Sequence, residues 1–204
     1  MLPYKQIKKL DFMTEKNNDI LKNQVIITAT SFLDEEEKSG NRGFKTKSFE
    51  EQMKSIGWKY GQAWCAYFIE LVWRTSFTSC GMSKIYQQSL NSLFSGSVVQ
   101  TFRNFKNSKL FEITKTPSEG CLVLWQSRKN PTSGHCGIVI SFTSNNLKTI
   151  EGNTNSNGSR EGYKVCRKSR TYSPAGYKLL GFVNLPDFCP ETVKQNEKFP
   201  LKVH

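Results

Sequence analysis

The sequence is poor in histidine and cysteine and has no long apolar run. It contains two histidines and six cysteines in 204 residues, and the cysteines are too sparse and too irregular to indicate a disulfide scaffold. Neither a CxxC nor an HxxxH spacing marks a closed zinc site, so we expect no metal and no other cofactor. No stretch approaches the roughly 20 apolar residues of a transmembrane helix, so we expect no membrane span. The N-terminus lacks the continuous apolar core of a secretory signal, so export would need another route.

Positive charge is in excess. The chain has 29 Lys and Arg against 17 Asp and Glu, a formal net charge of +12. Such a field attracts polyanions, which could be nucleic acid, an anionic membrane or a bacterial wall. Charge does not choose among them, and a solvated basic surface without a partner is an equally good interpretation. Since no recognition motif for nucleic acid is present, nucleic acid is the least expected partner.

Length and pattern favour one domain with an extra segment at each end. Residues 1–17 are polar and basic, and they are predicted to form an N-terminal arm. Residues 18–185 contain the periodic apolar patterns and are predicted to form the catalytic domain. Residues 186–204 are polar and contain lysines, and they are predicted to be a C-terminal tail. We expect a monomer.

The domain is predicted to begin with helices. Asn18–Asp19 can cap a helix that runs to about Leu33, and Ser48 with Glu51 resembles the capping box of a second helix. A third, strongly apolar helix starts at Cys65 and ends near Ser76. Residues 78–97 are assigned only short helical turns, and residues 98–105 a short helix.

A sheet is predicted to follow, so the fold class is α+β, with N-terminal helices packed on an antiparallel sheet of about five strands. The expected strands cover residues 121–125, 135–142, 147–151, 163–170 and 177–185. A three-residue loop after the second strand would place Val139 opposite Glu151 and Gly137 opposite Asn153. This register predicts that Asn153 lies nearer to His135 than Glu151 does.

Cys65 is the candidate nucleophile. It lies in the first turn of the apolar helix, where unpaired backbone N–H groups and the helix dipole favour a thiolate. Alone, the residue is more simply explained as a small buried core residue, which is the commoner fate of a free cysteine.

His135 is the candidate base, because His204 is the last residue of the polar tail. A cysteine on a helix and a histidine at the start of a strand are the components of a thiol hydrolase, in which Glu151 or Asn153 would orient the imidazole. The backbone N–H of Cys65 would stabilise the oxyanion, with Gln62 as a further donor. Trp64 is a candidate substrate contact, although a core position is the commoner role of such a residue.

Three segments resemble the signature blocks of CHAP domains, the cysteine, histidine-dependent amidohydrolases/peptidases. They are Gly61–Phe68, Gly134–Ile140 and Glu151–Thr154. The resemblance implies a papain-like fold that cleaves amide bonds of peptidoglycan, as in phage endolysins, virion-associated lysins and bacterial autolysins. It also implies that Cys65 is the nucleophile, His135 the base, and Glu151 with Asn153 the orienting pair.

The resemblance has two departures. Cys136 follows the histidine where a small aliphatic residue is more usual, and we expect this to affect packing only. No wall-binding repeat is present, so targeting would depend on the basic charge or on a phage particle. We expect no calcium site, because residues 34–37 lack spaced oxygen ligands.

The resemblance implies a phage-type lysin, present in the host cytoplasm before release or in the virion, that acts on the bacterial cell wall. The alternative is a non-catalytic wall-binding or virion structural protein that retains the fold.

Overall fold

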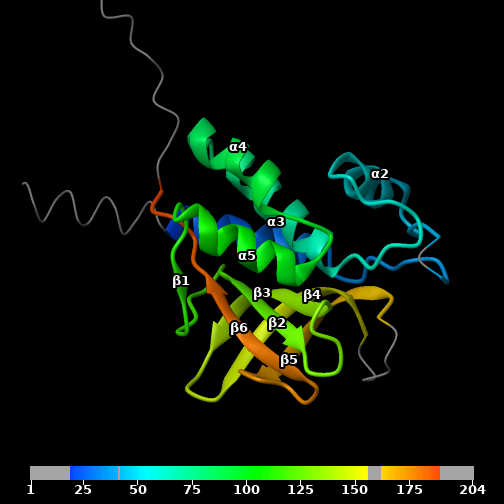
Figure 1. Ribbon diagram of the computed structural model, residues 1–204. Helices are drawn as coiled ribbons and strands as arrows, with labels where there is room; N and C mark the ends of the chain where they lie inside the picture. Colours follow the sequence, from blue (N-terminus) through cyan, green and yellow to red (C-terminus); the bar gives the residue numbers. More distant parts are fainter. Residues whose placement is uncertain (1–18, 41, 156–161, 189–204) are drawn as a thin grey trace, which may run out of the picture.

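The computed structural model describes residues 19–40, 42–155 and 162–188 and places helices over one face of a sheet (Figure 1). A helix over residues 19–31 is followed by α2 (Lys47–Ser55), α3 (Cys65–Ser79), α4 (Lys84–Leu93) and α5 (Val98–Ser108). The strands are β1 (Ile113–Thr114), β2 (Leu122–Ser127), β3 (Gly134–Phe142), β4 (Asn146–Thr154), β5 (Lys164–Thr171) and β6 (Tyr177–Val183). The predicted α+β class is confirmed.

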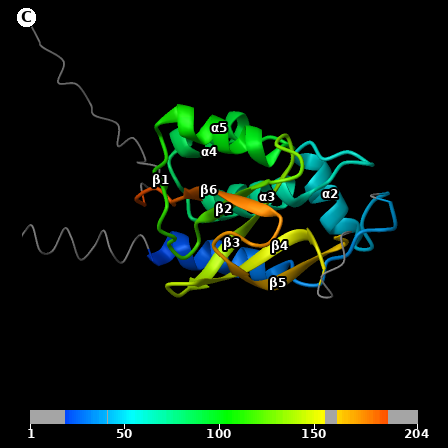
Figure 2. The same ribbon diagram turned by 60° about the horizontal axis from the view of Figure 1, so that its bottom comes forward.

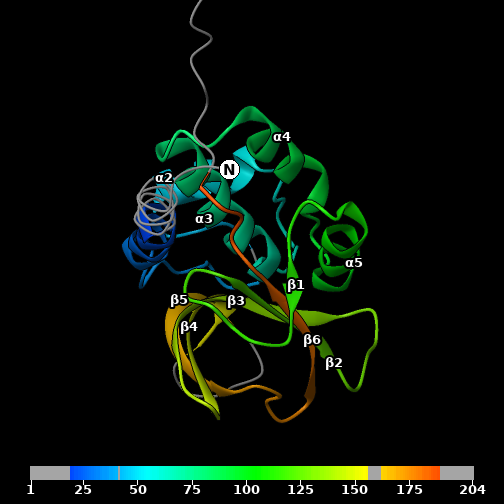
Figure 3. The same ribbon diagram turned by 90° about the vertical axis from the view of Figure 1, so that its left-hand side faces the viewer.

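Within the described residues the strands form one antiparallel sheet, in the order β1-β6-β2-β3-β4-β5. Strands β2, β3, β4 and β5 lie side by side in chain order, and β6 pairs with the other edge of β2. Figure 3 shows the sheet curling beneath the helices. The two-residue strand β1 was not predicted, because so short a segment has no periodic pattern.

Helix α3 lies at the centre of the molecule. Ten of its 15 residues are buried, as expected for a helix that is apolar on nearly all sides. It contacts the helices α2, α4 and α5 and also the strands β3 and β4, and Figure 2 shows it between these two groups. The first residue of α3 is therefore held at the boundary between the helices and the sheet.

The sheet is apolar on both faces. Leu122 and Leu124 of β2 join the large core under the helices, whereas the alternating Val123 and Trp125 join a second, smaller core on the opposite face. Successive side chains of a strand point to opposite faces. The continuous apolar run in β2 therefore reflects a strand that is covered on both sides.

Residues 34–37 pair with the outer strand β5 and the residue before it. The N–H of Asp34 donates to the carbonyl of Val165 at 3.0 Å, and the N–H of Val165 donates to Glu35 at 2.9 Å. The N–H of Glu37 donates to the carbonyl of Tyr163 at 2.7 Å. The acidic segment is thus bound along the edge of the sheet.

Two predictions about the helices are wrong. Helix α2 starts at Lys47 after Thr46, with no side-chain capping bond, so Ser48 and Glu51 form no capping box. Residues 84–93, which were expected to form short turns, make the ten-residue helix α4 and bury Leu90 and Leu93. Few apolar residues mark this helix in the sequence. The predicted cap at Asn18 lies outside the described residues.

The predicted register of the β3–β4 hairpin is also wrong. Val139 lies opposite Thr149, not Glu151, and the pairing shifts between Val139 and Ser141. A β-bulge of this kind adds an unpaired residue to one strand and cannot be read from an alternating pattern. The pairing nearest the site is therefore displaced by two residues, which keeps Glu151 on the expected face but moves it closer to His135.

Candidate active site

Cys65 is the first residue of α3 and follows a turn in which Gly61 has a φ of +85°. The preceding Trp64 is fully buried, and its indole Nε1 donates to Glu37 at 2.5 Å. The backbone carbonyl of Trp64 accepts the N–H of Phe68 at 2.9 Å and so begins the helix. The predicted position of Cys65 at a helix N-terminus is confirmed, and 7% of its surface is exposed.

His135 is the second residue of β3 and is 9% exposed. Its ring stacks on that of Trp125 in β2, with 6.3 Å between centroids and 9° between planes. The ring of Tyr177, in β6, lies 6.2 Å away. Three neighbouring strands therefore fix the plane of the imidazole.

Glu151 of β4 receives hydrogen bonds on both carboxylate oxygens. Oε2 lies 2.8 Å from Nε2 of His135 and 2.6 Å from a terminal nitrogen of Arg170. Oε1 accepts from the hydroxyl of Thr149 at 2.6 Å and from Nε of Arg170 at 3.0 Å. The carboxylate has no exposed surface, so these three residues determine its environment.

The thiol of Cys65 interacts with the side chains of both Cys136 and His135. Because Nε2 of His135 contacts Glu151, Nδ1 is the nitrogen left for the thiol. The expectation that Cys136 affects packing only is therefore wrong, because its thiol contacts the sulfur of Cys65. Helix α3 and the sheet together bring a thiol, an imidazole and a carboxylate into one row, in that order.

The electrostatics of the row formed by Cys65, His135 and Glu151 favour a thiolate next to an imidazolium. The hydrogen bond from Cys136 lowers the pKa of Cys65; burial opposes this effect, and His135 lowers the pKa further. Burial lowers the pKa of His135, but hydrogen bonds with Cys65 and Glu151 outweigh it and raise the pKa to about 9. Burial raises the pKa of Glu151, but Arg170 and His135 outweigh it and lower the pKa to about 2. Such an ion pair is the form in which a cysteine acts as a nucleophile.

Comparison with known families agrees with this arrangement, since residues 56–153 match the family model described as the CHAP domain. The chain carries a CHAP domain. The matched stretch contains Cys65, His135 and Glu151, and a CHAP domain implies amidase or peptidase activity on peptidoglycan. The comparison with curated proteins gave no match. Within the described part of the chain, no helix has the length and apolarity needed to cross a membrane.

Asn153, the other predicted orienting residue of the CHAP domain, does not face His135. Its φ is +53°, and with the amide oriented to suit its neighbours, its nitrogen donates to Gly162 at 2.7 Å. Its oxygen accepts the backbone N–H of Trp64 at 3.2 Å. The prediction that Asn153 lies nearer than Glu151 to His135 is wrong, because the amide of Asn153, on a left-handed backbone, binds Trp64 and Gly162, while Glu151 contacts His135. Asn153 instead holds the peptide that precedes Cys65.

The two remaining predicted residues flank the nucleophile without contacting His135 in the described structure. Oε1 of Gln62 accepts from the backbone of Lys59 and from the hydroxyl of Tyr67, both at 3.0 Å. The role of Gln62 as an oxyanion donor stays a prediction. Trp64 is packed among aromatic rings and presents no side-chain surface to a substrate, which fits the core position that is commoner for tryptophan.

The sequence did not single out Arg170 and Thr149, which bind the carboxylate of Glu151. Arg170 is one of several basic residues that alternate along β5, and Thr149 is an ordinary strand residue. The sequence held a signal for Thr149, because it precedes Glu151 by two on the same face of the strand. It held none for Arg170, which lies opposite Leu147 and reaches Glu151 through its long side chain.

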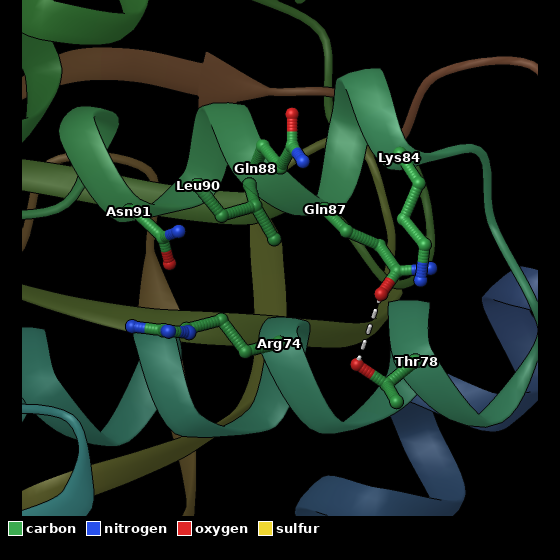
Figure 4. A pocket seen from close by; sticks show the side chains of 7 residues that line it. All are labelled: Arg74, Thr78, Lys84, Gln87, Gln88, Leu90 and Asn91. Atoms are coloured by element: carbon green, nitrogen blue, oxygen red, sulfur yellow. Dashed lines mark hydrogen bonds between the residues drawn. The ribbon is translucent and has the colours of Figure 1, made fainter.

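A separate hollow of about 360 Å³ lies between α3 and α4 (Figure 4). Arg74 and Thr78 line it from α3, and Lys84 and Gln87 line it from α4. At 1.5 Å per residue, Arg74 and Thr78 lie roughly 14 and 20 Å along the helix from Cys65. This hollow is therefore not part of the thiol site. Among the described residues, no three His, Cys, Asp or Glu side chains are grouped to hold a metal ion.

Proposed function

We propose that this CHAP domain is a thiol hydrolase that cleaves an amide bond of peptidoglycan, either N-acetylmuramoyl–L-alanine or a bond of the stem or bridge peptide. The observation that carries the proposal is the contact between Cys65, at the N-terminus of a buried helix, and His135, whose other nitrogen is held by Glu151. A structural cysteine has no need of an oriented imidazole.

In the proposed reaction the Cys65 thiolate attacks the carbonyl carbon of the amide and forms a tetrahedral oxyanion. The backbone N–H of Cys65 stabilises that oxyanion, with the side-chain amide nitrogen of Gln62 as a second donor. The imidazolium of His135 gives its proton to the leaving amine, the C–N bond breaks and an acyl-enzyme remains. His135 then takes a proton from water, whose oxygen attacks the thioester and releases the carboxylate and the thiolate.

The proposed setting is a phage-type lysin that meets the cell wall after release or as part of a virion. The distribution of charge supports contact with anionic wall polymers. Residues 113–183, which include the sheet, contain ten Lys and Arg but three Asp and Glu. Retention of the protein on sacculi should accordingly weaken as salt concentration rises, because salt screens exposed charges.

Mass spectrometry of purified sacculi tests the reaction. Wild type should release soluble fragments, and Cys65→Ala should release none. A free lactyl carboxylate with a free N-terminal L-alanine would identify an amidase, and new N-termini within the stem or bridge peptides without a free lactyl carboxylate would identify an endopeptidase. Cys80→Ala is the matched control, because Cys80 lies at the other end of α3 and burial raises the pKa of its thiol.

Two results would reject the proposal. One is digestion by Cys65→Ala at the wild-type rate. The other is retention of the wild-type protein on sacculi without release of any fragment, which would support the non-catalytic wall-binding alternative.

A further inference from the structure

The carboxylate of Glu151 has more partners than an orienting role for His135 requires. One oxygen is shared between His135 and Arg170, and the other is held by Thr149 and Arg170. A carboxylate has about four lone-pair directions, so the four contacts, at 2.6 to 3.0 Å, occupy all of them. The group can neither rotate nor bind water without losing a hydrogen bond.

Arg170 also balances the charge of these buried groups, because the Cys65 thiolate and the Glu151 carboxylate together carry one more charge than the His135 imidazolium. The Glu151 side chain is fully buried, whereas that of Arg170 is 22% exposed. A buried carboxylate without a cation is costly and tends to take up a proton. The guanidinium binds both oxygens through two nitrogens, a geometry that lysine cannot reproduce.

We propose that Arg170 and Thr149 are positioning residues of the thiol site, which fix the Glu151 carboxylate and limit how strongly it holds the proton of His135. This inference rests on the proposed function. His135 must keep a proton to form the ion pair with Cys65, yet must give it to the leaving amine. Oε2 interacts with both Arg170 and His135. The positive charge of Arg170 therefore makes Glu151 stabilise the imidazolium less than a carboxylate with no other cation nearby would.

The sign of the effect follows from charge. In Arg170→Gln, the positive charge is removed while Thr149 still holds Oε1, so the imidazolium of His135 is stabilised more and its pKa rises. Arg170→Lys keeps the charge but loses the two-point contact, so the pKa changes little while the geometry loosens. Thr149→Val is nearly isosteric and removes one hydrogen bond, so it frees the carboxylate without changing charge.

Nuclear magnetic resonance of protein labelled with ¹⁵N-histidine measures this directly. The chain has two histidines, so His204→Ala in every variant leaves the signals of His135 alone. We expect the His135 titration midpoint to rise by about 0.5 units or more in Arg170→Gln, since each unit corresponds to a tenfold change in proton affinity. Arg170→Lys and Thr149→Val should stay nearer the wild-type midpoint.

Hydrolysis of sacculi is the second measurement. Arg170→Gln should lose about 10- to 100-fold in activity, as partners that orient a reacting ligand commonly do. Thr149→Val should lose about 2- to 10-fold, the equivalent of one hydrogen bond. Arg167→Gln is the matched control, because Arg167 is an exposed residue of the same strand and pairs with Ile150 rather than Glu151. It should resemble wild type in both measurements.

The inference is overturned if folded Arg170→Gln titrates and hydrolyses as Arg167→Gln does. Should Arg170→Gln fail to fold, Thr149→Val decides: wild-type activity in that variant would reject the positioning role. A shifted His135 midpoint in a protein whose wild type digests no sacculi would reject the proposed function and leave the positioning of Glu151 intact.

Discussion

Two buried glutamates, Glu151 and Glu70, each bind an arginine, yet their pKa values move in opposite directions. Glu70 of α3 is 5% exposed and has a hydrogen bond to Arg74 at 2.9 Å. Burial outweighs this bond and raises the pKa of Glu70. For Glu151 burial also acts to raise the pKa, but Arg170 and His135 outweigh it and bring the pKa to about 2.

The difference shows that one ionic partner is not enough to hold the pKa of a buried carboxylate below its ordinary value. Arg74 offers one nitrogen from a side chain that is 34% exposed, whereas Arg170 offers two, and Thr149 and His135 complete the set. The free-energy cost of desolvating a carboxylate is offset only when hydrogen bonds satisfy its lone pairs. The candidate site differs from an ordinary helix ion pair in the number of donors, not in the kind of residue.

The sharpest way to break the comparison is to neutralise each glutamate. Glu151→Gln should reduce hydrolysis by about 10²- to 10⁴-fold, because the imidazolium loses its counter-charge and its preferred orientation. Glu70→Gln should leave hydrolysis within about twofold of wild type, the range of a substitution away from the reacting groups. Rates on sacculi, corrected for the folded fraction, measure both. Equal losses in the two variants would contradict the distinction.

Crowding the carboxylate tests its placement without changing its charge. A Cβ at Gly137 would lie 2.7 Å from Cγ of Glu151 and 3.2 Å from the carbonyl of Ile150. Gly137→Ala should therefore displace Glu151, reduce hydrolysis by about 10-fold or more and cost about 1–3 kcal/mol of stability. If the substitution acts through Glu151, adding it to Glu151→Gln should lower activity little further. Additive losses would show that Gly137 acts by another route.

The nucleophile's neighbour on β3 offers a smaller perturbation. Cys136→Ala removes the interaction that contributes most to lowering the pKa of Cys65, so that pKa should rise. Alkylation of Cys65 by iodoacetamide near neutral pH should become slower, as followed by peptide mass spectrometry. Cys80→Ala is the control, since Cys80 lies at the other end of α3. Unchanged alkylation in Cys136→Ala would mean that the thiol–thiol contact does not stabilise the thiolate.

The two glutamates should change the free energy of unfolding in opposite directions as pH falls. The folded pKa of Glu151, about 2, lies below the ordinary value of 4.5, so its contribution is complete above pH 4.5 and is lost as pH falls towards 2, about 3 kcal/mol in all. The pKa of Glu70 is raised, so its ionisation destabilises the fold and acidification relieves that cost. Urea unfolding at pH 2 to 7 should show a shallower acid loss in Glu151→Gln and a steeper one in Glu70→Gln.

The row of catalytic candidates could be predicted in part from the sequence because its members lie in segments of strong pattern. The apolar helix that starts at Cys65 and the apolar strand that starts near His135 both leave a clear periodicity. The bulge after Val139 and the left-handed backbone of Asn153 leave none, so the choice between Glu151 and Asn153 could not be made correctly.

Arg170 and Cys136 were missed as contacts for related reasons. A basic residue in a chain with 29 Lys and Arg is by default a solvated one, and only its contact with Glu151 of the neighbouring strand distinguishes Arg170. A cysteine beside the histidine is by default a packing residue. Both roles depend on contacts between two segments of the fold, which the periodicity of either segment alone does not describe.

The pairing of residues 34–37 with the outermost part of the sheet has a consequence for behaviour at high concentration. Unpaired backbone groups on a terminal strand act as a template on which a second chain can add, and the result is aggregation. Here Val165 already exchanges hydrogen bonds with Asp34 and Glu35, and the covering segment is acidic on an otherwise basic protein. Loss of that segment would expose a ready surface for fibril-like growth beside the active centre.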